Sequence, residues 1–193
     1  MLEIILVRHG ETNGNKKGEY FGFTDQELNE EGINQAILLK ERLKDLLVDK
    51  IYSSPLKRAK KTAEIINENF GLPIEYSHNL KERNFGIWEG MVDDEIRLNF
   101  PYEYEKWIND WKGYSIKDGE SAIESFQRVE SFIRDNIEWS KKGRYLIVTH
   151  LGTIRYIIVQ LLGMKIEDSW RFRVGNCGMV KIQITDGYGV LTL

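Results

Sequence analysis

The chain has 193 residues, of which 41% are hydrophobic and 30% are charged, and its formal net charge at pH 7 is −3. This length is close to that of one ordinary domain and supplies enough apolar material for one hydrophobic core. We therefore expect a single domain over residues 1–193. The slight acidic excess lacks the basic surplus of nucleic-acid-binding proteins and argues against a nucleic-acid partner.

Cysteine usage and apolar patterning constrain the compartment. Cys177 is the sole cysteine, so neither an internal disulfide nor a thiolate zinc site can form. The apolar run Ile4–Val7 is shorter than the roughly 7–15 residues of a secretory signal or the about 20 of a membrane span. We expect a cytoplasmic protein with no membrane partner, present as a monomer or a homodimer.

The first quarter of the chain predicts a buried strand and then a helix. Leu2–Val7 is a nearly all-apolar run, which is typical of a strand covered on both faces in a parallel sheet. Over Glu30–Leu47 apolar residues recur at helical spacing opposite a charged face, and Asn29 precedes them as an N-cap. The apolar stripe expected to face the core comprises Ile33, Ala36, Ile37, Leu39, Leu43, Leu46 and Leu47.

A second strand and helix follow directly. Ile51–Tyr52 is short and apolar, and Ser54 with Pro55 supplies an N-cap and a first-position proline for the helix. Gly71 is expected to end that helix. The side chains expected to be buried by it are Leu56, Ala59, Ala63, Ile66 and Phe70.

The later elements continue this alternation. They are a helix over Ser121–Trp139, a strand over Tyr145–Val148, a helix that ends by Gly163, and strands over Met179–Thr185 and Gly189–Leu193. This order predicts an α/β fold with a mainly parallel central sheet between two layers of helices, a three-layer α/β/α arrangement. In such folds ligands bind at the carboxyl ends of the strands.

Residues 86–119 interrupt the regular pattern and are rich in aromatic side chains, which predicts short helices and loops inserted over a site as a small cap. Between Trp88 and Tyr114 seven acidic residues against three basic ones disfavour a second anionic group on a substrate. The aromatic rings either stack on a planar leaving group or form the core of the cap itself, and the sequence leaves both interpretations open.

Arginine and histidine side chains gather where three predicted strands end. Arg8 and His9 follow the first strand, Arg58 lies shortly after the second, and His150 ends the third. A single histidine after a strand is usually structural, whereas two histidines with arginines beside them indicate one reactive crevice. A metal site is the main competing interpretation, because histidine is the commonest metal ligand. The guanidinium groups argue against it, since they repel a divalent ion and match phosphate oxygens.

A phosphate monoester fits this crevice. It carries a charge of about −1.5 to −2 near neutral pH, and arginine, imidazole and helix-start N–H groups can surround its oxygens. A neutral imidazole can also attack phosphorus directly. The nucleotide loops G-x-x-x-x-G-K-[ST] and G-x-G-x-x-G are absent from the chain. A small phosphomonoester is therefore the expected partner.

Five blocks of residues, spread in order over most of the chain, carry a specific pattern. They are Leu6 to Thr12 with Asn15; Gly22, Asp25, Leu28 and Gly32; Ser53 to Ala59 with Thr62 and Ala63; Leu80, Glu82, Phe85, Gly86 and Trp88 to Gly90; and Leu146 to His150. Together they resemble the histidine phosphatase superfamily, the phosphoglycerate-mutase-like proteins. The resemblance implies a metal-independent phosphoric monoester hydrolase that needs no organic cofactor.

The resemblance also implies a role for each catalytic candidate. His9 would be the nucleophile that forms a phosphohistidine, while Arg8, Arg58 and His150 would hold the phosphoryl oxygens. Glu82 would protonate the leaving oxygen as a general acid and then activate water as a base. From the residues alone, Glu82 would be read as a surface carboxylate.

Four further residues are candidate substrate-binding residues: Asn15, Thr24, Trp88 and Leu151. The family resemblance implies that Asn15 adds a hydrogen bond to the phosphoryl group. Leu151 departs from the family pattern, in which glycine commonly follows the second histidine, and its larger side chain is expected to narrow the pocket.

Within the superfamily, Phe85–Gly90 resembles the phosphatase branches rather than the mutases. Four segments resemble the α-ribazole phosphatases of cobalamin nucleotide-loop assembly: Trp107–Trp111, Asp118–Ser121, Phe126–Val129 and Trp170–Val174. This resemblance implies hydrolysis of α-ribazole 5′-phosphate to α-ribazole. The alternatives are a broad-specificity, phosphoserine or sugar-phosphate phosphatase, a phosphoglycerate mutase, and a non-catalytic phosphate-binding protein.

Overall fold

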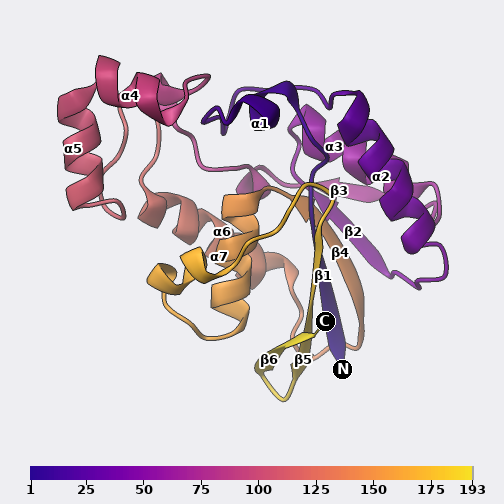
Figure 1. The fold of residues 1–193 in the computed structure, drawn as a ribbon. Helices are drawn as coiled ribbons and strands as arrows, with labels where there is room; N and C mark the ends of the chain where they lie inside the picture. The colour runs from indigo at the N-terminus through magenta and orange to yellow at the C-terminus, as the bar shows by residue number, and fades with distance from the viewer. Residues whose placement is uncertain (193) are drawn as a thin grey trace.

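The central sheet runs in the order β3-β2-β4-β1-β5-β6 in a computed structural model that describes residues 1–192 (Figure 1). Its strands are β1 (Leu2–Arg8), β2 (Lys50–Ser53), β3 (Ile74–Tyr76), β4 (Gly143–Thr149), β5 (Met179–Thr185) and β6 (Tyr188–Thr192). The first four are parallel to one another, whereas β5 runs antiparallel to β1 and β6 antiparallel to β5. The prediction of a mainly parallel sheet is confirmed.

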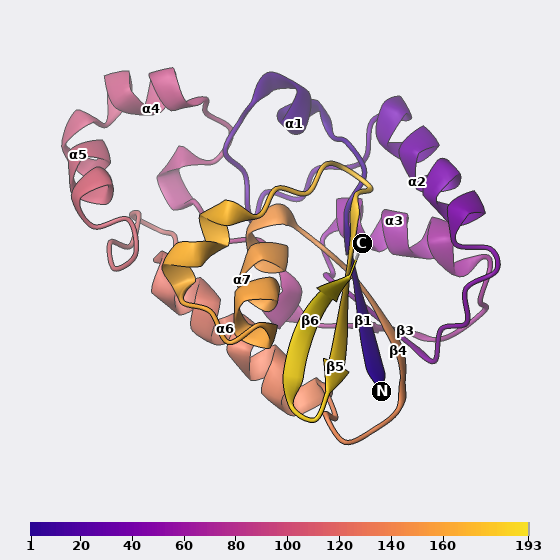
Figure 2. The same ribbon diagram turned by 60° about the horizontal axis from the view of Figure 1, so that its bottom comes forward.

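Helices cover both faces of this sheet, as Figures 1 and 2 show. The α-helices are α1 (Asn13–Lys17), α2 (Glu30–Arg42), α3 (Lys57–Asn67), α4 (Asp93–Asn99), α5 (Pro101–Asn109), α6 (Ala122–Asn136) and α7 (Leu151–Leu161). Short 3₁₀ helices span His78–Leu80, Gly86–Trp88 and Ile166–Arg171. The pair α2 and α3 lies on one face and the pair α6 and α7 on the other, which confirms the three-layer prediction. Over residues 1–192, no helix combines the length and apolarity that crossing a membrane requires.

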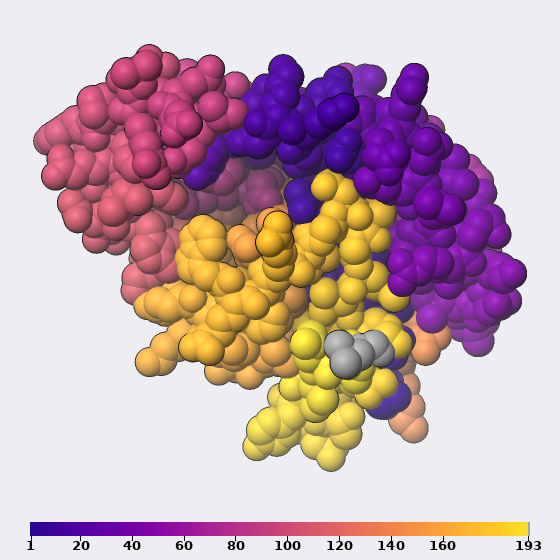
Figure 3. All heavy atoms as spheres, in the orientation of Figure 1, coloured from indigo at the N-terminus to yellow at the C-terminus, as the bar shows by residue number. Residues whose placement is uncertain are grey.

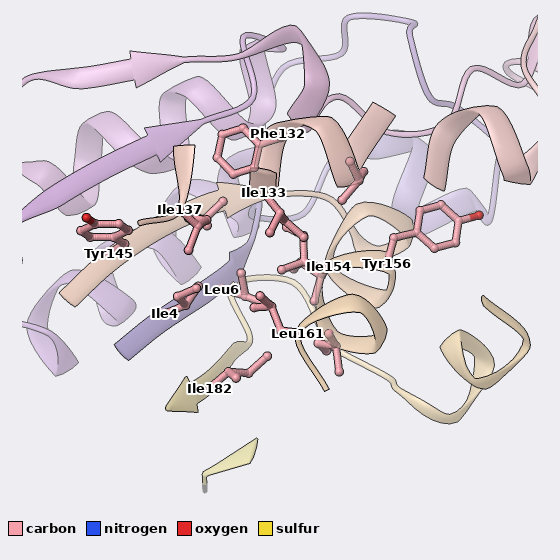
Figure 4. Close-up of a cluster of buried hydrophobic side chains, with 14 of the residues drawn as sticks. Ile4, Leu6, Phe132, Ile133, Ile137, Tyr145, Ile154, Tyr156, Leu161 and Ile182 are labelled. Carbon is pink, nitrogen blue, oxygen red and sulfur yellow. The ribbon is translucent and has the colours of Figure 1, made fainter. Parts of the chain in front are cut away.

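The alternation of side chains along β1 explains why both faces need a helical layer. Ile4 and Leu6 pack with side chains of α6 and α7 in one cluster, part of which Figure 4 shows. Ile5 and Val7 point the other way and pack with side chains of α2 and α3. All four are fully buried, and each contributes about 1.5–3 kcal/mol of transfer free energy. A strand of this composition is stable only between two apolar layers.

The register of the sheet brings three strand ends together. Arg8 of β1 lies opposite Thr149 of β4, and Ser53 of β2 lies opposite Val148 of the same strand. The residues that follow, His9 and His150, therefore leave the sheet side by side at its carboxyl edge. Their imidazole centroids are 5.1 Å apart. The predicted convergence of the two histidines is confirmed.

The helix predicted over Glu30–Leu47 is observed as α2, and its predicted C-terminal end is wrong. Asn29 caps α2 by accepting from the Gly32 N–H at 2.8 Å, as expected, but the helix ends at Arg42 and Leu47 is 80% exposed. Ile33 and Ile37 also lie outside the core. The buried apolar seam is narrow and consists of Ala36 and Leu39 of α2 and of Leu43 at its C-cap. Helical periodicity alone predicts a wider apolar stripe than the one that α3 and the sheet bury.

The predicted start of the next helix is also wrong. Helix α3 begins at Lys57, and Leu56 stands at its N-cap without a side-chain cap bond. The Ser54 hydroxyl bonds the Nε2 atom of His150 at 2.8 Å, and it accepts from the Leu56 N–H at only 3.3 Å. The serine that resembles a cap in the sequence is therefore committed to the strand-end crevice.

The remaining boundaries differ by a few residues. Ser121 caps α6 through a capping box with Glu124, but the helix ends at Asn136, short of Trp139. The last predicted strand is observed as β6, and its final position, Leu193, lies outside the described residues. Helix α1 and strand β3 were not predicted, because both are too short to show a period.

Candidate active site

A cavity of about 310 Å³ opens at the carboxyl edge of the sheet. Figure 3 shows the surface hollowed where the magenta cap, the indigo N-terminal segment and the orange to yellow C-terminal segment meet. The lining residues are Arg8, His9, Asn15, Gly18, Glu19, Tyr20, Phe21, Arg58, Glu82, Phe85 and Leu151. Six of the nine predicted site residues therefore line this one cavity.

His9 is held in a single orientation. Its Nδ1 lies 2.7 Å from the carbonyl oxygen of Gly10, which can only accept, so Nδ1 carries the proton and Nε2 keeps its lone pair. The ring is almost completely buried. Burial, followed by the charges of Arg58 and Arg8, lowers the pKa of His9 well below 6.5. The imidazole is thus neutral, with an unprotonated Nε2.

His150 is fixed from both sides. Its Nδ1 accepts from the Nε–H of Arg58 at 3.2 Å, so its Nε2 carries the proton and donates to the Ser54 hydroxyl at 2.8 Å. Burial is the main cause that lowers the pKa of His150 well below 6.5, and Arg58 adds to it. The second imidazole is therefore also neutral, and its tautomer is the reverse of that of His9.

Arg58 is a fully buried guanidinium group in the first turn of α3. Its Nη2 donates to the Gly22 carbonyl at 2.7 Å and its Nη1 to the Thr24 carbonyl at 2.9 Å. Burial lowers the pKa of Arg58 to about 10, so the group stays cationic at neutral pH. The loop at residues 22–24 and His150 together hold this charge at the cavity wall.

Arg8 supplies a second cationic wall. It is the last residue of β1, and its Nη1 donates to the Val174 carbonyl at 2.9 Å. Its Nε is buried and has no hydrogen-bond partner among residues 1–192. An unpaired buried guanidinium donor costs free energy unless an acceptor is supplied, which suits an anionic ligand.

The amide of Asn15 is oriented by its neighbours. Its Oδ1 accepts from the Thr12 N–H and from the Nδ2 group of Asn176, both at 3.1 Å. The Nδ2 group of Asn176 also donates to the His9 carbonyl at 3.1 Å. With its oxygen held in this way, Asn15 presents its amide nitrogen to the cavity as a donor. Sequence reasoning missed Asn176, which is 161 positions from Asn15 in the chain.

The carboxylate of Glu82 is held by two backbone N–H groups from different parts of the chain. Its Oε1 accepts from the Arg83 N–H at 3.0 Å and its Oε2 from the Gly152 N–H at 2.9 Å. A Cβ atom on residue 152 would displace this carboxylate, so glycine there leaves room for the observed position of Glu82. The carboxylate also lies in the field of four guanidinium groups, those of Arg8, Arg58, Arg83 and Arg155. Within residues 1–192, no group of three or more His, Cys, Asp or Glu side chains is arranged to hold a metal ion.

A second cavity of about 240 Å³ adjoins the first one. The two share Tyr20, Glu82, Phe85 and Leu151, so Glu82 faces both of them. The other lining residues are Arg83, Trp107, Trp111, Gly152, Arg155, Tyr156, Ser169 and Trp170. We call this second space the aromatic cavity. Leu151 stands where the two cavities meet.

Two predicted substrate-binding residues lie elsewhere. Trp88 is fully buried in the core of the cap with Ile96 and Ile116, so its prediction as a substrate-binding residue is wrong. Thr24 lines neither cavity, and its hydroxyl bonds the carboxylate of Glu89. Its carbonyl, not its side chain, contributes to the site by holding Arg58.

The acidic residues of the cap do not face the cavities, so their number does not bear on the charge of a substrate bound there. None of the seven acidic residues between Trp88 and Tyr114 lines either cavity, within the described part of the chain. Glu89 instead accepts backbone N–H groups, and Asp93 bonds Tyr104 and Arg97. A charge count along the sequence does not record the direction of side chains, so it misses this inward use of carboxylates.

Some aromatic rings of the cap form its core, and others line a cavity. Trp88, Tyr104 and Trp107 pack with one another in the core of the cap. Trp107 also lines the aromatic cavity together with Trp111 and Trp170. Arg155 and Tyr156 of α7 complete the wall and carried no sequence signal, because they lie in a helix that reads only as buried core.

The two neutral imidazoles predict a stability that falls in mild acid. The unfolded chain binds protons at these histidines near pH 6.5, whereas the folded chain, with both pKa values lowered, does not. The free energy of unfolding therefore falls as the pH drops from about 7 to about 5.5, by up to about 1.4 kcal/mol per pH unit for each histidine. Urea unfolding followed by circular dichroism over this range measures the slope.

The matched control for this slope removes both titrating groups. The variant is the double replacement of His9→Asn and His150→Asn. We expect its stability to be nearly independent of pH between about 7 and about 5.5. A slope of the same size in the double variant would contradict the assignment.

Comparison with known proteins agrees with this geometry. A model of the histidine phosphatase superfamily (branch 1) matches residues 4–193. The chain is 33% identical over 190 residues to the adenosylcobalamin/α-ribazole phosphatase of Escherichia coli, covering 98% of this chain and 94% of that protein. It is 31% identical over 191 residues to phosphoserine phosphatase 1 of Hydrogenobacter thermophilus, covering 99% and 90%.

A solved structure extends the likeness to the fold. The crystal structure of the α-ribazole phosphatase from Shigella flexneri matches with a TM-score of 0.93 at 34% identity, and the match covers 99% of this chain and 95% of that one. The family model and the fold both match over the whole chain. The two histidines and the two arginines at the carboxyl edge of the sheet agree with these matches. The chain therefore belongs to the histidine phosphatase superfamily and is a phosphoric monoester hydrolase.

Proposed function

We propose that this hydrolase acts through a phosphohistidine formed on His9. The observation that carries the proposal is the orientation of the imidazole, whose protonated Nδ1 is bound to Gly10 and whose Nε2 keeps its lone pair in a cationic cavity. Arg8 and Arg58 supply the positive charge that a phosphoryl group in transfer requires. Asn15 adds a neutral donor, and His150 stands beside the nucleophile.

The first half-reaction forms one bond and breaks another. Nε2 of His9 donates its lone pair to phosphorus while the bond from phosphorus to the leaving oxygen breaks. The protonated carboxyl of Glu82 gives its proton to that oxygen, so the leaving group departs as an alcohol. The products of this step are the phosphohistidine, the alcohol and the Glu82 carboxylate.

The second half-reaction restores the enzyme. The Glu82 carboxylate takes a proton from water as its oxygen attacks phosphorus, and the bond between Nε2 and phosphorus breaks. Inorganic phosphate leaves, His9 regains its lone pair and Glu82 is again protonated. Arg8 and Arg58 neutralise the phosphoryl oxygens in both half-reactions.

For the substrate, we propose α-ribazole 5′-phosphate. The support is the aromatic cavity, which adjoins Glu82 on the side where the leaving oxygen must meet its proton. Trp111 and Trp170 meet edge to face there, with ring centroids 5.6 Å apart. A planar benzimidazole suits such walls, since offset and edge contacts between aromatic rings are worth about 0.5–1.5 kcal/mol beyond their buried area.

Phosphoserine is the second candidate, and one residue of the same cavity favours it. The guanidinium of Arg155 lies 5.1 Å from the ring centroid of Trp170, and its Nε donates to the Phe172 carbonyl at 2.7 Å. Its remaining N–H groups can pair with the carboxylate of a small phosphorylated amino acid.

A panel of substrates decides between them. We would measure kcat/KM for α-ribazole 5′-phosphate, phosphoserine, fructose 2,6-bisphosphate and 3-phosphoglycerate. We expect α-ribazole 5′-phosphate to exceed the others by about tenfold, which corresponds to about 1.4 kcal/mol of stacking. An average rate on this substrate would reject the choice.

Two variants test how the aromatic cavity discriminates between the two candidate substrates. Trp170→Leu removes a ring and is expected to lower kcat/KM for α-ribazole 5′-phosphate by about 3- to 10-fold, with phosphoserine little changed. Arg155→Met is expected to lower kcat/KM for phosphoserine more than kcat/KM for α-ribazole 5′-phosphate. Trp139→Leu, at a half-exposed tryptophan beyond the end of α6, is the matched control and should change neither.

Glu89 gives a further prediction, because it holds the loop that holds Arg58. Its carboxylate accepts from the N–H groups of Gly22, Phe23 and Phe85 at 2.7 to 3.2 Å, and also from Thr24. Glu89→Gln replaces one acceptor by a donor that faces these donors. We expect a loss of about 1–3 kcal/mol in the free energy of unfolding, measured with urea.

The same variant should affect catalysis. The carbonyls of Gly22 and Thr24, which accept from Arg58, lie in the loop that Glu89 secures. We expect kcat/KM for p-nitrophenyl phosphate to fall by about tenfold, equivalent to about 1.4 kcal/mol. Asp94→Asn, at an exposed position of α4, is the control. Wild-type stability and rate in Glu89→Gln would refute the role of this carboxylate.

A further inference from the structure

We propose that Arg128 of α6, paired with Glu120, is a positioning residue that sets the orientation of the Glu82 carboxyl group. Arg128 lines neither the catalytic nor the aromatic cavity. Its guanidinium group bonds the backbone of the segment that carries Glu82, outside both cavities. This inference rests on the proposed acid and base role of Glu82 and adds the device that keeps that group in place.

The backbone around Glu82 has little regular structure of its own. After the short 3₁₀ helix His78–Leu80, the chain crosses residues 81–85 with neither a helix nor a strand to fix it. The carbonyls in such a segment need partners from elsewhere when they are buried. Side chains of three separate elements supply these partners.

Arg128 provides most of them. Its Nη1 donates to the carbonyls of Asn79 and Lys81 at 2.9 and 3.0 Å, and its Nη2 lies 3.3 Å from the carbonyl of Glu82 itself. Thr149 at the end of β4 donates to the intervening carbonyl of Leu80 at 2.6 Å, and Thr153 of α7 also donates to that of Lys81 at 2.8 Å. Four consecutive carbonyls, at residues 79–82, are therefore each held by a side chain.

Glu120 fixes the guanidinium in turn. Its Oε1 lies 2.6 Å from Nη2 of Arg128, and its Oε2 lies 3.3 Å from Nε. Both side chains are only 17% exposed, which makes the pair less screened than a surface ion pair. The same Oε1 accepts from the Asn84 N–H at 3.0 Å. The pair thus grips the segment on both sides of Glu82.

The geometry points to orientation rather than simple attachment. A general acid must lie within hydrogen-bond reach of the leaving oxygen, and a displacement of about 1 Å costs about a hundredfold in rate. Three donors of one planar guanidinium group fix the rotation of the segment as well as its position. A lysine keeps the charge but cannot reproduce the fork.

Leaving-group dependence separates this role from a general loss of stability. Phenyl phosphate and p-nitrophenyl phosphate are similar in shape, but phenolate is much more basic than p-nitrophenolate and needs the proton of Glu82 far more. We expect Arg128→Lys to lower kcat/KM for phenyl phosphate by at least about tenfold more than for p-nitrophenyl phosphate. Because kcat/KM reports on formation of the phosphohistidine, later water attack does not obscure the comparison.

Two reference variants make the result decisive. Glu82→Gln defines the pattern expected when the proton is absent, and Arg134→Lys, at an exposed position of the same helix, should behave as wild type. Equal losses on both phosphates in Arg128→Lys, or none, would overturn the positioning role. If Glu82→Gln itself shows no dependence on the leaving group, the proposed acid role fails instead.

A second variant covers the case in which Arg128→Lys folds poorly. Glu120→Gln keeps the shape of its side chain and weakens the hold on Nη2, and it is expected to show the same selective loss on phenyl phosphate by about 3- to 10-fold. Circular dichroism and thermal melting establish that it is folded. A folded Glu120→Gln that hydrolyses both phosphates at the wild-type ratio would contradict the inference.

Discussion

Replacing His9 by alanine is expected to abolish turnover, with kcat for p-nitrophenyl phosphate falling by a factor of about 10⁴ or more. The change removes the proposed nucleophile from a cavity whose cationic walls it leaves in place. The same variant should fail to acquire acid-labile label from a ³²P-labelled substrate after a rapid quench. Wild-type protein should acquire it.

The matched control is the third histidine of the chain. His78 begins a 3₁₀ helix and lines neither the catalytic nor the aromatic cavity, so His78→Ala should keep the wild-type rate and the label. The His9→Ala change leaves the Gly10 carbonyl without its imidazole donor, so circular dichroism is needed to check that the variant is folded. A His9→Ala enzyme that keeps more than a tenth of the wild-type rate would rule out this nucleophile.

Arg58→Lys is expected to lower kcat/KM by about 10²–10³, although it nominally conserves the charge. Arg58 uses separate nitrogens to hold Gly22, Thr24 and His150, and one ammonium group cannot span these acceptors. Burial already lowers the pKa of Arg58 to about 10. A lysine starts from a lower pKa, so the same burial neutralises part of it near pH 7.

This difference predicts a pH signature. Lysine at position 58 loses its proton as the pH rises, so the ratio of variant to wild-type kcat/KM should decline between about pH 6 and pH 8. Steady-state rates on p-nitrophenyl phosphate in buffers of equal ionic strength measure it. Arg134→Lys, at an exposed site, should keep a constant ratio of one. A small loss that is independent of pH in Arg58→Lys would count against a buried cationic wall.

The sequence was sufficient to predict the layered fold and the meeting of the strand ends. The apolar alternation in β1 requires a helical layer on each face, and parallel pairing places His9 and His150 at one edge. These inferences use only local periodicity and the geometry of parallel sheets. They hold because both features are repeated over many residues.

Other parts of the site depend on contacts that periodicity does not encode. The cap-like serine at position 54 bonds His150, and the acidic Glu89 faces backbone N–H groups instead of solvent. We infer that the placement of Glu82 depends on Arg128, which lies 46 positions later on α6. Trp88 illustrates the same limit, because a large aromatic residue beside a motif can serve the core of the cap alone.

The order of the strands has a consequence for how the chain is made. Residues 2–8 leave the ribosome long before residues 143–149 and 179–184, with which they pair. Until β4 is made, strand β1 therefore has both edges unpaired, a condition that favours aggregation and engagement by chaperones. Asn176, which orients Asn15, arrives later still than β4. A nascent chain consequently gains its fold and its chemistry together, once residues 143–184 have been made.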